Sequence, residues 1–491
     1  MRVHRLRRVM AVAALAATAI LVSAPAAGAH PRLLTAEPEP STVAPAPLDR
    51  ITVRFDEAVQ WEHSRVEVED TDGHSVLGEG KPELRGREAV LTLAPGTSGP
   101  LRVSWRIVGI DAHPVIGAYV FGIHDAAALG SGDLDSTIRQ LAGTLGEGRV
   151  GSDGLNWAIR GGRSLEIVLL YLVLGILLLR VLVLKHEPAP GRGPGAATAI
   201  ALGPDRGYRM MRTLGLAAAL AMPFLFVLYV ARLDAAVGNV SIGEVLFSSL
   251  GETWGLKTVL WLAIAGACLY GLRRHPSGSR QHDLLLLSLA AGAAIAFGFN
   301  THANGLSPNL LWTPMMFGHL MVTAFWAGGL VALLLIVFPS ADPARIWPAV
   351  SRYSNIMTLT VGLVVVSGLV MLLRLLSGNV KGMWCSDFGV VAGFKMAVVA
   401  IAIVIGLINN RVVAYQKRSL TAPVNQFRPR KERSIASLRR LIAIEAVVLG
   451  SAVLLSGALG ETQLPSVFKG HFFPADLQEN VRPGLFGSGC Q

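Results

Sequence analysis

Charged side chains are scarce in this chain of 491 residues, and cysteines are scarcer still. Only 16% of the residues are charged, compared with roughly 25% in an average soluble protein, and 52% are apolar. This composition excludes a disordered chain, a collagen repeat and a coiled coil, and it indicates that much of the chain lies in lipid. The 3 cysteines form no CxxC pair, which excludes a disulfide scaffold and argues against a thiolate metal site.

The first 29 residues have the organisation of a secretory signal. A basic start with four arginines is followed by an apolar run over 9–22 and by Ala27-Gly28-Ala29, which has the small side chains of a cleavage site. We therefore predict cleavage after Ala29, so that His30 becomes the first residue of the mature protein. The alternative is an uncleaved membrane anchor, which the short apolar run disfavours.

Residues 30–128 alternate between apolar and polar side chains with the period of a β-strand. Ile51, Val53 and Phe55 form one such run, Val103 and Trp105 belong to another, and clusters of Pro, Gly and Asp separate the runs. This pattern predicts a small antiparallel β-sandwich. Residues 129–162, which are rich in Gly, Ser and Asp, are predicted to link the sandwich to the rest of the chain.

Eight long apolar runs follow, and each could cross the roughly 30 Å hydrocarbon core of a bilayer as a helix. No soluble helical protein needs eight such runs, so residues 163–462 are predicted to form an all-α bundle of eight transmembrane helices, with a tail over 463–491. The runs are 164–184, 212–233, 247–272, 283–302, 314–338, 353–376, 388–409 and 439–460.

Positive charge is concentrated in alternate connecting segments of this bundle. With the sandwich exported, the segments predicted to be inside are rich in Arg and Lys, whereas 234–246 and 301–313 contain neither. This bias follows the positive-inside rule and predicts a multi-pass protein of the bacterial plasma membrane, with the sandwich and the C-terminal tail extracytoplasmic. The net charge of +11 therefore reflects topology and does not indicate nucleic-acid binding. Cys385 and Cys490 fall on the same outer side, which leaves a disulfide between them open, and Cys268 lies within a span.

The predicted mature terminus offers two metal ligands from one residue. The α-amine and the imidazole of His30 can close a chelate ring, and Pro31 has no backbone N–H that could join the metal. Asp111 and His113 are two residues apart, so their side chains point the same way in extended backbone, and Glu57 follows a predicted strand. This set of nitrogen and oxygen ligands suits Cu(II), and Zn²⁺ accepts the same residue types. A solvated turn is the simpler interpretation of Asp111 and His113 taken alone.

These residues lie in segments that resemble the CopC family of copper-resistance proteins. The resemblance is carried by HPRL at 30–33, FDE at 55–57, VSWRIVGIDAHP at 103–114 and GAYVF at 117–121, and it spans nearly the whole predicted sandwich. The resemblance implies a Greek-key, immunoglobulin-like fold. It also implies a Cu(II) site formed by His30, Asp111 and His113; many members add a glutamate at the strand end, which corresponds to Glu57 here. Some members carry a Met-rich Cu(I) loop, but residues 70–85 contain His74 and no Met, so we expect one Cu(II) site and no Met-rich site.

The membrane part resembles the CopD family over roughly 160–465. The resemblance is carried by NTHA at 300–303, GHL at 318–320, AFWAGGL at 324–330, FG at 388–389 with Lys395, NNR at 409–411, and LRR at 438–440 with Glu445. A fused CopC–CopD arrangement implies copper import across the plasma membrane. We expect Glu445 to lie near the inner face and to pair with Arg439 or Arg440.

Histidine and methionine side chains mark a membrane copper path in this topology. His302 is expected at the outer end of its span and His319 about one turn inside the next one, where ionisable residues are costly and tend to be functional. Met315 and Met316 are close in sequence, and thioethers favour Cu(I). The alternatives are that His302 caps a helix, that His319 bonds between helices, and that the methionines pack or face lipid.

Three functions are compatible with these features. In the first, the sandwich captures Cu(II) and the bundle imports copper; the protein is then not an enzyme, because the sequence offers no nucleophile–base pair or phosphate loop. In the second, His302 and His319 ligate a b-type haem that reduces Cu(II), which would make the protein a cupric reductase. In the third, the chain sequesters or senses copper outside the cell without moving it. The expected partners are copper and the lipid bilayer, and the sequence identifies no reductase or copper chaperone.

Overall fold

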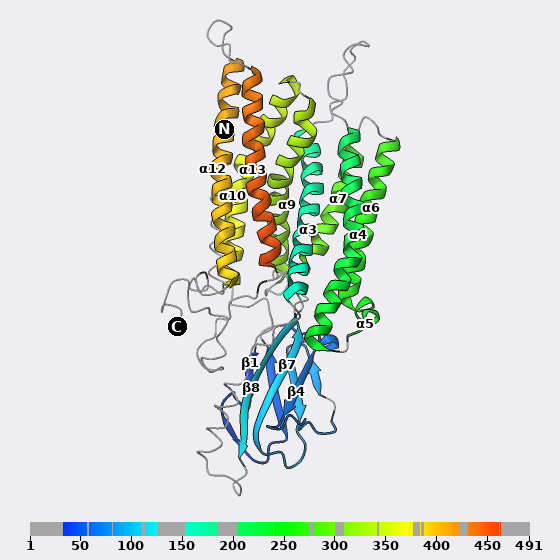
Figure 1. The fold of residues 1–491 in the computed structure, drawn as a ribbon, viewed down its shortest axis with the longest axis vertical. Helices are drawn as coiled ribbons and strands as arrows, with labels where there is room; N and C mark the ends of the chain where they lie inside the picture. Colours follow the sequence, from blue (N-terminus) through cyan, green and yellow to red (C-terminus); the bar gives the residue numbers. More distant parts are fainter. Residues whose placement is uncertain are drawn as a thin grey trace.

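The computed structural model combines a β-sandwich with a bundle of long helices (Figure 1). The predicted signal, most of the predicted linker and all of the predicted tail lie outside the described part. The structure describes residues 33–55, 58–80, 82–109, 114–124, 153–184, 204–238, 240–274, 279–299, 309–340, 343–376, 383, 387–421, 431–460 and 462.

Two four-stranded sheets form the sandwich, in the orders β1-β3-β6-β5 and β2-β8-β7-β4. Ile51, Val53 and Phe55 are fully buried, as their alternation in the sequence predicts. All pairings are antiparallel except that of β2 with β8, which is parallel. The strands are β1 Leu33–Glu37, β2 Val43–Pro45, β3 Arg50–Phe55, β4 Arg65–Glu69, β5 Glu83–Arg85, β6 Glu88–Thr92, β7 Gly99–Val108 and β8 Pro114–His124, with a short 3₁₀ turn, η1, at Trp61–His63.

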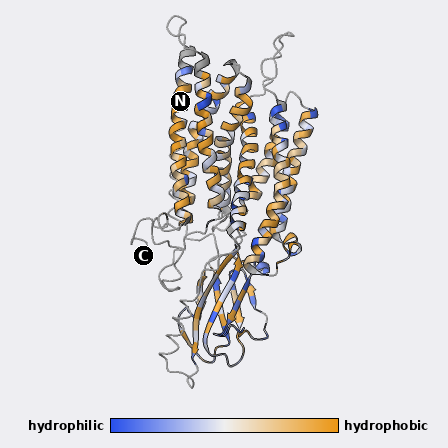
Figure 2. Cartoon of the chain, viewed as in Figure 1, coloured by the Kyte–Doolittle hydropathy of each residue, from blue (hydrophilic) through white to orange (hydrophobic). Residues whose placement is uncertain are grey.

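Eight helices of the described chain are long and apolar enough to cross a membrane, which confirms the predicted number of spans. Apolar residues cover most of their length in Figure 2, whereas polar and apolar residues mix in the sandwich. The helices are α3 Asp153–Leu178, α4 Pro204–Val237, α6 Ser249–Arg274, α7 Arg280–Gly298, α9 Asn309–Ala332, α10 Pro343–Leu375, α12 Asp387–Thr421 and α13 Lys431–Leu459. Single π-turns extend α3 (η2, Leu179–Val183) and α9 (η3, Leu333–Val337), and a short helix, α5 (Ile242–Leu246), joins α4 to α6.

The sandwich lies against one end of the bundle, which we call the sandwich end; the opposite end is the far end (Figure 1). Helices α3, α6, α9 and α12 begin at the sandwich end, and α4, α7, α10 and α13 end there. Strands β7 and β8 contact α4, and Val108, the last residue of β7, is fully buried in the same apolar core as the helices. The sandwich and the bundle therefore share part of one core.

Helices α3 and α9 approach each other at a pair of glycines, Gly175 and Gly328. A Cβ atom on Gly328 would lie 2.8 Å from the carbonyl carbon of Tyr171 and 3.0 Å from the Cα of Gly175. Both neighbours are backbone atoms, so no rotamer change could make room. Because glycine has no side chain, these two residues allow α9, which carries His319, to lie in backbone contact with α3.

Candidate metal centre and membrane path

The predicted Cu(II) ligands His30, Glu57, Asp111 and His113 lie outside the described residues, as does His302. Cys385 and Cys490, the proposed disulfide partners, also lie outside them. These assignments stay predictions. The residues that flank the four ligands are described, however, and their positions show which strand ends come together.

Strand register joins the flanking residues of all four predicted ligands at one edge of the sandwich. Leu33, three residues after His30, pairs with Phe55, the residue before Asp56-Glu57. Val59 forms an isolated antiparallel bridge with Gly109. The last pair of the β7–β8 ladder is Val108 with Pro114, so residues 109–113 connect two adjacent strands. This edge is the one that the buried Val108 brings to the bundle.

A hydrogen-bonded clamp fixes the end of β7 just before the Asp111-Ala112-His113 motif. The backbone N–H of Gln60 donates to the Val108 carbonyl and its side-chain amide donates to the Gly109 carbonyl, both at 2.9 Å. The Ser64 hydroxyl donates to the Gln60 carbonyl at 2.7 Å and accepts from the Val108 N–H at 2.9 Å. Sequence reasoning missed this clamp, because a Gln and a Ser four residues apart give no pattern of their own.

His63, in η1 beside this clamp, lies where the sandwich meets α5. Its side chain is buried, and its Nε2 atom has no hydrogen-bond partner in the described part of the chain. Across the interface, the backbone N–H of Ser241 donates to Glu244 at the start of α5 and lowers the pKa of that carboxyl. An electrostatic interaction with His63 contributes in the same direction, more weakly. The sandwich at His63 and the start of α5 are therefore close enough to interact electrostatically.

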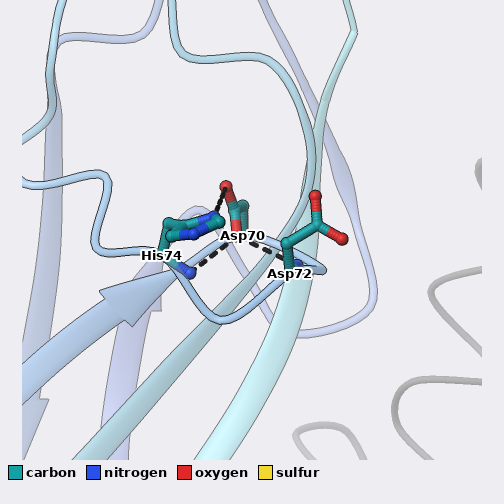
Figure 3. Close-up of side chains that lie close together, drawn as sticks. All are labelled: Asp70, Asp72 and His74. Carbon is teal, nitrogen blue, oxygen red and sulfur yellow. Dashed lines mark hydrogen bonds and ion pairs between the residues drawn. The ribbon is translucent and has the colours of Figure 1, made fainter.

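Asp70, Asp72 and His74 form a second group of potential ligands, on an exposed turn after β4 (Figure 3). Asp70 accepts the backbone N–H groups of Asp72 at 3.0 Å and His74 at 2.9 Å, and these bonds, His74 first, lower the pKa of its carboxyl. The group is far from the predicted site: Glu69 pairs with Arg102, and the seven residues from there to Gly109 correspond to about 23 Å of strand. The hydrogen bonds within this turn explain why the three side chains lie close together.

Within the bundle, His319 of α9 is partly buried and its Nδ1 atom lies 2.8 Å from the hydroxyl of Ser367 on α10. The charge of Lys395 on α12 acts on the same imidazole, so three helices meet there. A ring nitrogen held by Ser367 leaves the other nitrogen, Nε2, as the one that a metal could use. The interhelical hydrogen bond that we considered as an alternative is present and is compatible with metal binding at Nε2.

Methionines lie on the sandwich side of this histidine. Met315 is four residues before His319 on α9, and Met371 is four residues beyond Ser367 on α10, so each lies one turn nearer the sandwich end. Met315 packs against a cluster that includes Met383, whereas Met316 packs against the main core of the bundle. The structure thus separates the two predicted methionines and adds Met371 and Met383, which are distant in sequence.

Glu445 is not paired with Arg439 or Arg440, contrary to our expectation. Residues five and six apart do not face each other on a helix, and Glu445 instead points into the bundle, where its side chain is 3% exposed. Its Oε1 atom accepts from the indole N–H of Trp326 at 2.9 Å, and its Oε2 atom accepts from the amide of Asn409 at 2.6 Å. Trp326 and Asn409 belong to α9 and α12, so this carboxyl joins three helices.

Two other buried carboxyls are neutralised by cations. In the half of the bundle nearer the sandwich, Glu166 lies 2.9 Å from Lys257 Nζ and 3.2 Å from Arg163 Nη1. At the far end, Arg180 Nε lies 3.1 Å from both oxygens of Asp283, and the Tyr208 hydroxyl donates to Asp283 at 2.9 Å. Neither cluster was predicted, because its members come from different helices.

Comparisons with known proteins agree with this division into two parts. Residues 33–124 match the CopC domain family and residues 347–459 match the family described as Copper resistance protein D. The Copper transport protein CutJ of Bacillus subtilis (strain 168) is 23% identical over 357 residues, which cover 70% of this chain and 60% of CutJ. The chain thus spans less than two thirds of the length of that relative.

Two solved structures are similar to the sandwich. CopC from Methylosinus trichosporium OB3b is 24% identical and covers 21% of this chain and 100% of its own, with a TM-score of 0.19. PcoC, a methionine-rich copper resistance protein from Escherichia coli, is 28% identical and covers 19% of this chain and 99% of its own, with a TM-score of 0.18. The two family matches and their order along the sequence show a fused arrangement, in which a region that matches the CopC domain precedes a region that matches Copper resistance protein D.

Proposed function

We propose that this protein acquires copper: the exported sandwich binds Cu(II), and the membrane bundle carries copper to the cytoplasm. The observation that carries the proposal is the strand register, which brings the flanks of His30, Glu57, Asp111 and His113 to the edge of the sandwich that touches the bundle. The copper-related families that match both parts, and the name of the related transport protein, support the same function.

The capture site follows from chain connectivity. His30 is three residues before Leu33, and Leu33 pairs with Phe55, which is two residues before Glu57. Asp111 is two residues beyond Gly109, and His113 directly precedes Pro114. An amine, two imidazoles and carboxylates form a ligand set that favours Cu(II). The resident metal of this site is its cargo, and the Gln60–Ser64 clamp holds the strand end from which two of the ligands extend.

The hand-off is supported by how the sandwich contacts the helices. Val108 belongs to the core of the bundle and lies three residues before Asp111. A metal ion released at this edge therefore leaves the sandwich at the sandwich end of the bundle. The route onward uses Met315 and Met371, then the Nε2 atom of His319. Thioethers and imidazole together suit Cu(I), so each Cu(II) ion has to accept one electron from a donor outside this chain before copper enters this path.

Capture can be tested by titrating the full-length protein with Cu(II) and following the d–d absorbance band. The His113→Ala variant should lose the band and bind Cu(II) at least tenfold more weakly. His74→Ala is the matched control, because it removes an exposed histidine of the same domain about 23 Å away along the strands. Equal losses in both variants, or no loss in His113→Ala, would show that the ligands are wrongly assigned.

Transport can be tested by measuring uptake of labelled copper in cells with and without the chain. His319→Ala should abolish the chain-dependent uptake while leaving the Cu(II) band intact. No difference between cells with and without the wild-type chain would remove the transport function and favour sequestration outside the cell. A haem Soret band in the purified protein would instead favour the electron-transfer alternative.

A further inference from the structure

Three acidic side chains are buried among the helices in the part of the chain that the structure describes. Glu166, Asp283 and Glu445 are 2%, 0% and 3% exposed. Glu166 has Lys257 and Arg163 as partners, and Asp283 has Arg180. Glu445 differs from both, because its hydrogen-bond partners, Trp326 and Asn409, are neutral groups. At equal burial, these three carboxyls differ in the charge that surrounds them.

The depth of Glu445 makes this difference important. The apolar span of α13 runs from Ile435 to Leu459, so Glu445 is about 15 Å from one end and about 21 Å from the other. A carboxylate in the middle of a bilayer is costly unless an opposite charge compensates it. A bound proton removes the negative charge without any cationic side chain.

The geometry of the Asn409 contact suits a carboxyl that gains and loses a proton. Asn409 lies 2.6 Å from Glu445 Oε2, within hydrogen-bond distance. The nitrogen and oxygen of a side-chain amide occupy interchangeable positions. Asn409 can therefore donate to an ionised Glu445, or turn its oxygen toward a protonated one and accept.

Few other titratable groups face Glu445. The Tyr353 hydroxyl of α10 interacts with it electrostatically and donates to the backbone carbonyls of Phe325 and Trp326. On α3, Glu166 and Arg180 are held in their own ion pairs, and on α12 the charge of Lys395 acts on His319. Within the described residues, no lysine, arginine or histidine pairs with Glu445.

We propose that Glu445 is a proton-binding site of the membrane domain, which holds one proton as a neutral carboxylic acid at rest and releases it to water during the transport cycle. Its partner Trp326 is seven residues, or two turns, beyond His319 on the same face of α9. The proton site and the copper path therefore share one helix. The link between proton release and copper movement rests on the proposed function, whereas proton binding does not.

Infrared spectroscopy of the full-length protein in lipid bilayers tests proton binding directly. At neutral pH the exposed carboxyls are ionised, so a carbonyl band of protonated carboxylic acid reports a shielded acid. The wild type should show this band, and Glu445→Gln should lose it. Glu166→Gln is the matched control and should retain it, because Lys257 and Arg163 lie beside Glu166 as cationic partners that Glu445 does not have. A band of equal size in Glu445→Gln, or its absence from the wild type, overturns the proposal.

A second variant keeps the test decisive if Glu445→Gln does not fold. Trp326→Phe removes the hydrogen bond to Glu445 Oε1 and keeps an aromatic ring in its place. The carbonyl band of the acid should then shift to higher frequency without losing area. An unshifted band shows that the protonated group is not Glu445.

Copper uptake by proteoliposomes tests the link to transport. An imposed pH gradient should change the initial uptake rate of the wild type several-fold and leave the rate of Glu445→Gln unchanged. If both proteins respond equally, proton release is not part of the cycle. If the wild type takes up no copper under any gradient, the proposed function fails, and the infrared result still decides whether Glu445 carries a proton.

Discussion

Replacing Gly328 by alanine should separate two helices that the fold holds in backbone contact. The new Cβ atom would lie 2.8 Å from the carbonyl carbon of Tyr171, and closer to its oxygen, whereas apolar atoms pack best at about 3.5–4.0 Å. Helices α3 and α9 must therefore move apart by about 1 Å. Because the obstacle is backbone, no side-chain rotation relieves it.

The cost of this separation should lie at the upper end of the range for overpacked cores, about 2–3 kcal/mol. At about 2 °C per kcal/mol, the melting temperature of the purified protein should fall by about 5 °C. Uptake of copper should fall as well, since α9 carries both His319 and Trp326. Thermal unfolding followed by circular dichroism in detergent measures the first effect, and labelled copper measures the second.

Gly450→Ala provides the matched control, because a Cβ atom at this position of α13 would meet nothing within 4 Å. The same substitution in a helix without a steric obstacle should stabilise slightly, by up to about 1 kcal/mol. If Gly328→Ala melts at the same temperature as Gly450→Ala, the glycine contact does not determine the distance between α3 and α9, and the reasoning fails.

Three further outcomes are expected. Gln60→Ala should weaken Cu(II) binding about tenfold while the sandwich stays folded, because it frees the strand end before the predicted ligands. Absorbance titration measures the affinity, and circular dichroism measures the fold. Tyr208→Phe should lower the free energy of unfolding by about 1.5–3 kcal/mol in a denaturant titration, because Asp283 loses a hydrogen bond but keeps Arg180. The lowered pKa of Glu244 means that its cap stabilises α5 at neutral pH and loses this effect as acid protonates it. Hydrogen-exchange protection of α5 should therefore fall with acid in the wild type and stay constant in Glu244→Gln.

The sandwich and the spans were predictable from sequence because each depends on local periodicity. Alternation placed Ile51, Val53 and Phe55 in the core, and hydropathy over about 20 residues identified all eight helices. The parallel pairing of β2 with β8 was not predictable, because strand neighbours depend on the path of the whole chain.

Hydrogen bonds between different helices of the bundle could not be predicted from the sequence. Glu445 was assigned to Arg439 or Arg440, which are near in sequence, whereas Asn409 and Trp326 are 36 and 119 residues away. Rotation of α13 about its axis decides which side chains Glu445 meets, and hydropathy does not fix that rotation. Ser367 was missed for the same reason: its hydroxyl is one of many in the spans until the fold brings it to His319.

The burial of Val108 in the helical core couples the sandwich energetically to the bundle. Its side chain belongs to the helical core, and its backbone belongs to the strand that leads to Asp111 and His113. Any rearrangement of the helices that disturbs this residue would change the geometry of the predicted metal site. Thermodynamic reciprocity then requires that metal occupancy alter the balance between helix arrangements by the same free energy. Metal binding to the sandwich would thus change the arrangement of the helices before any ion has entered the bundle.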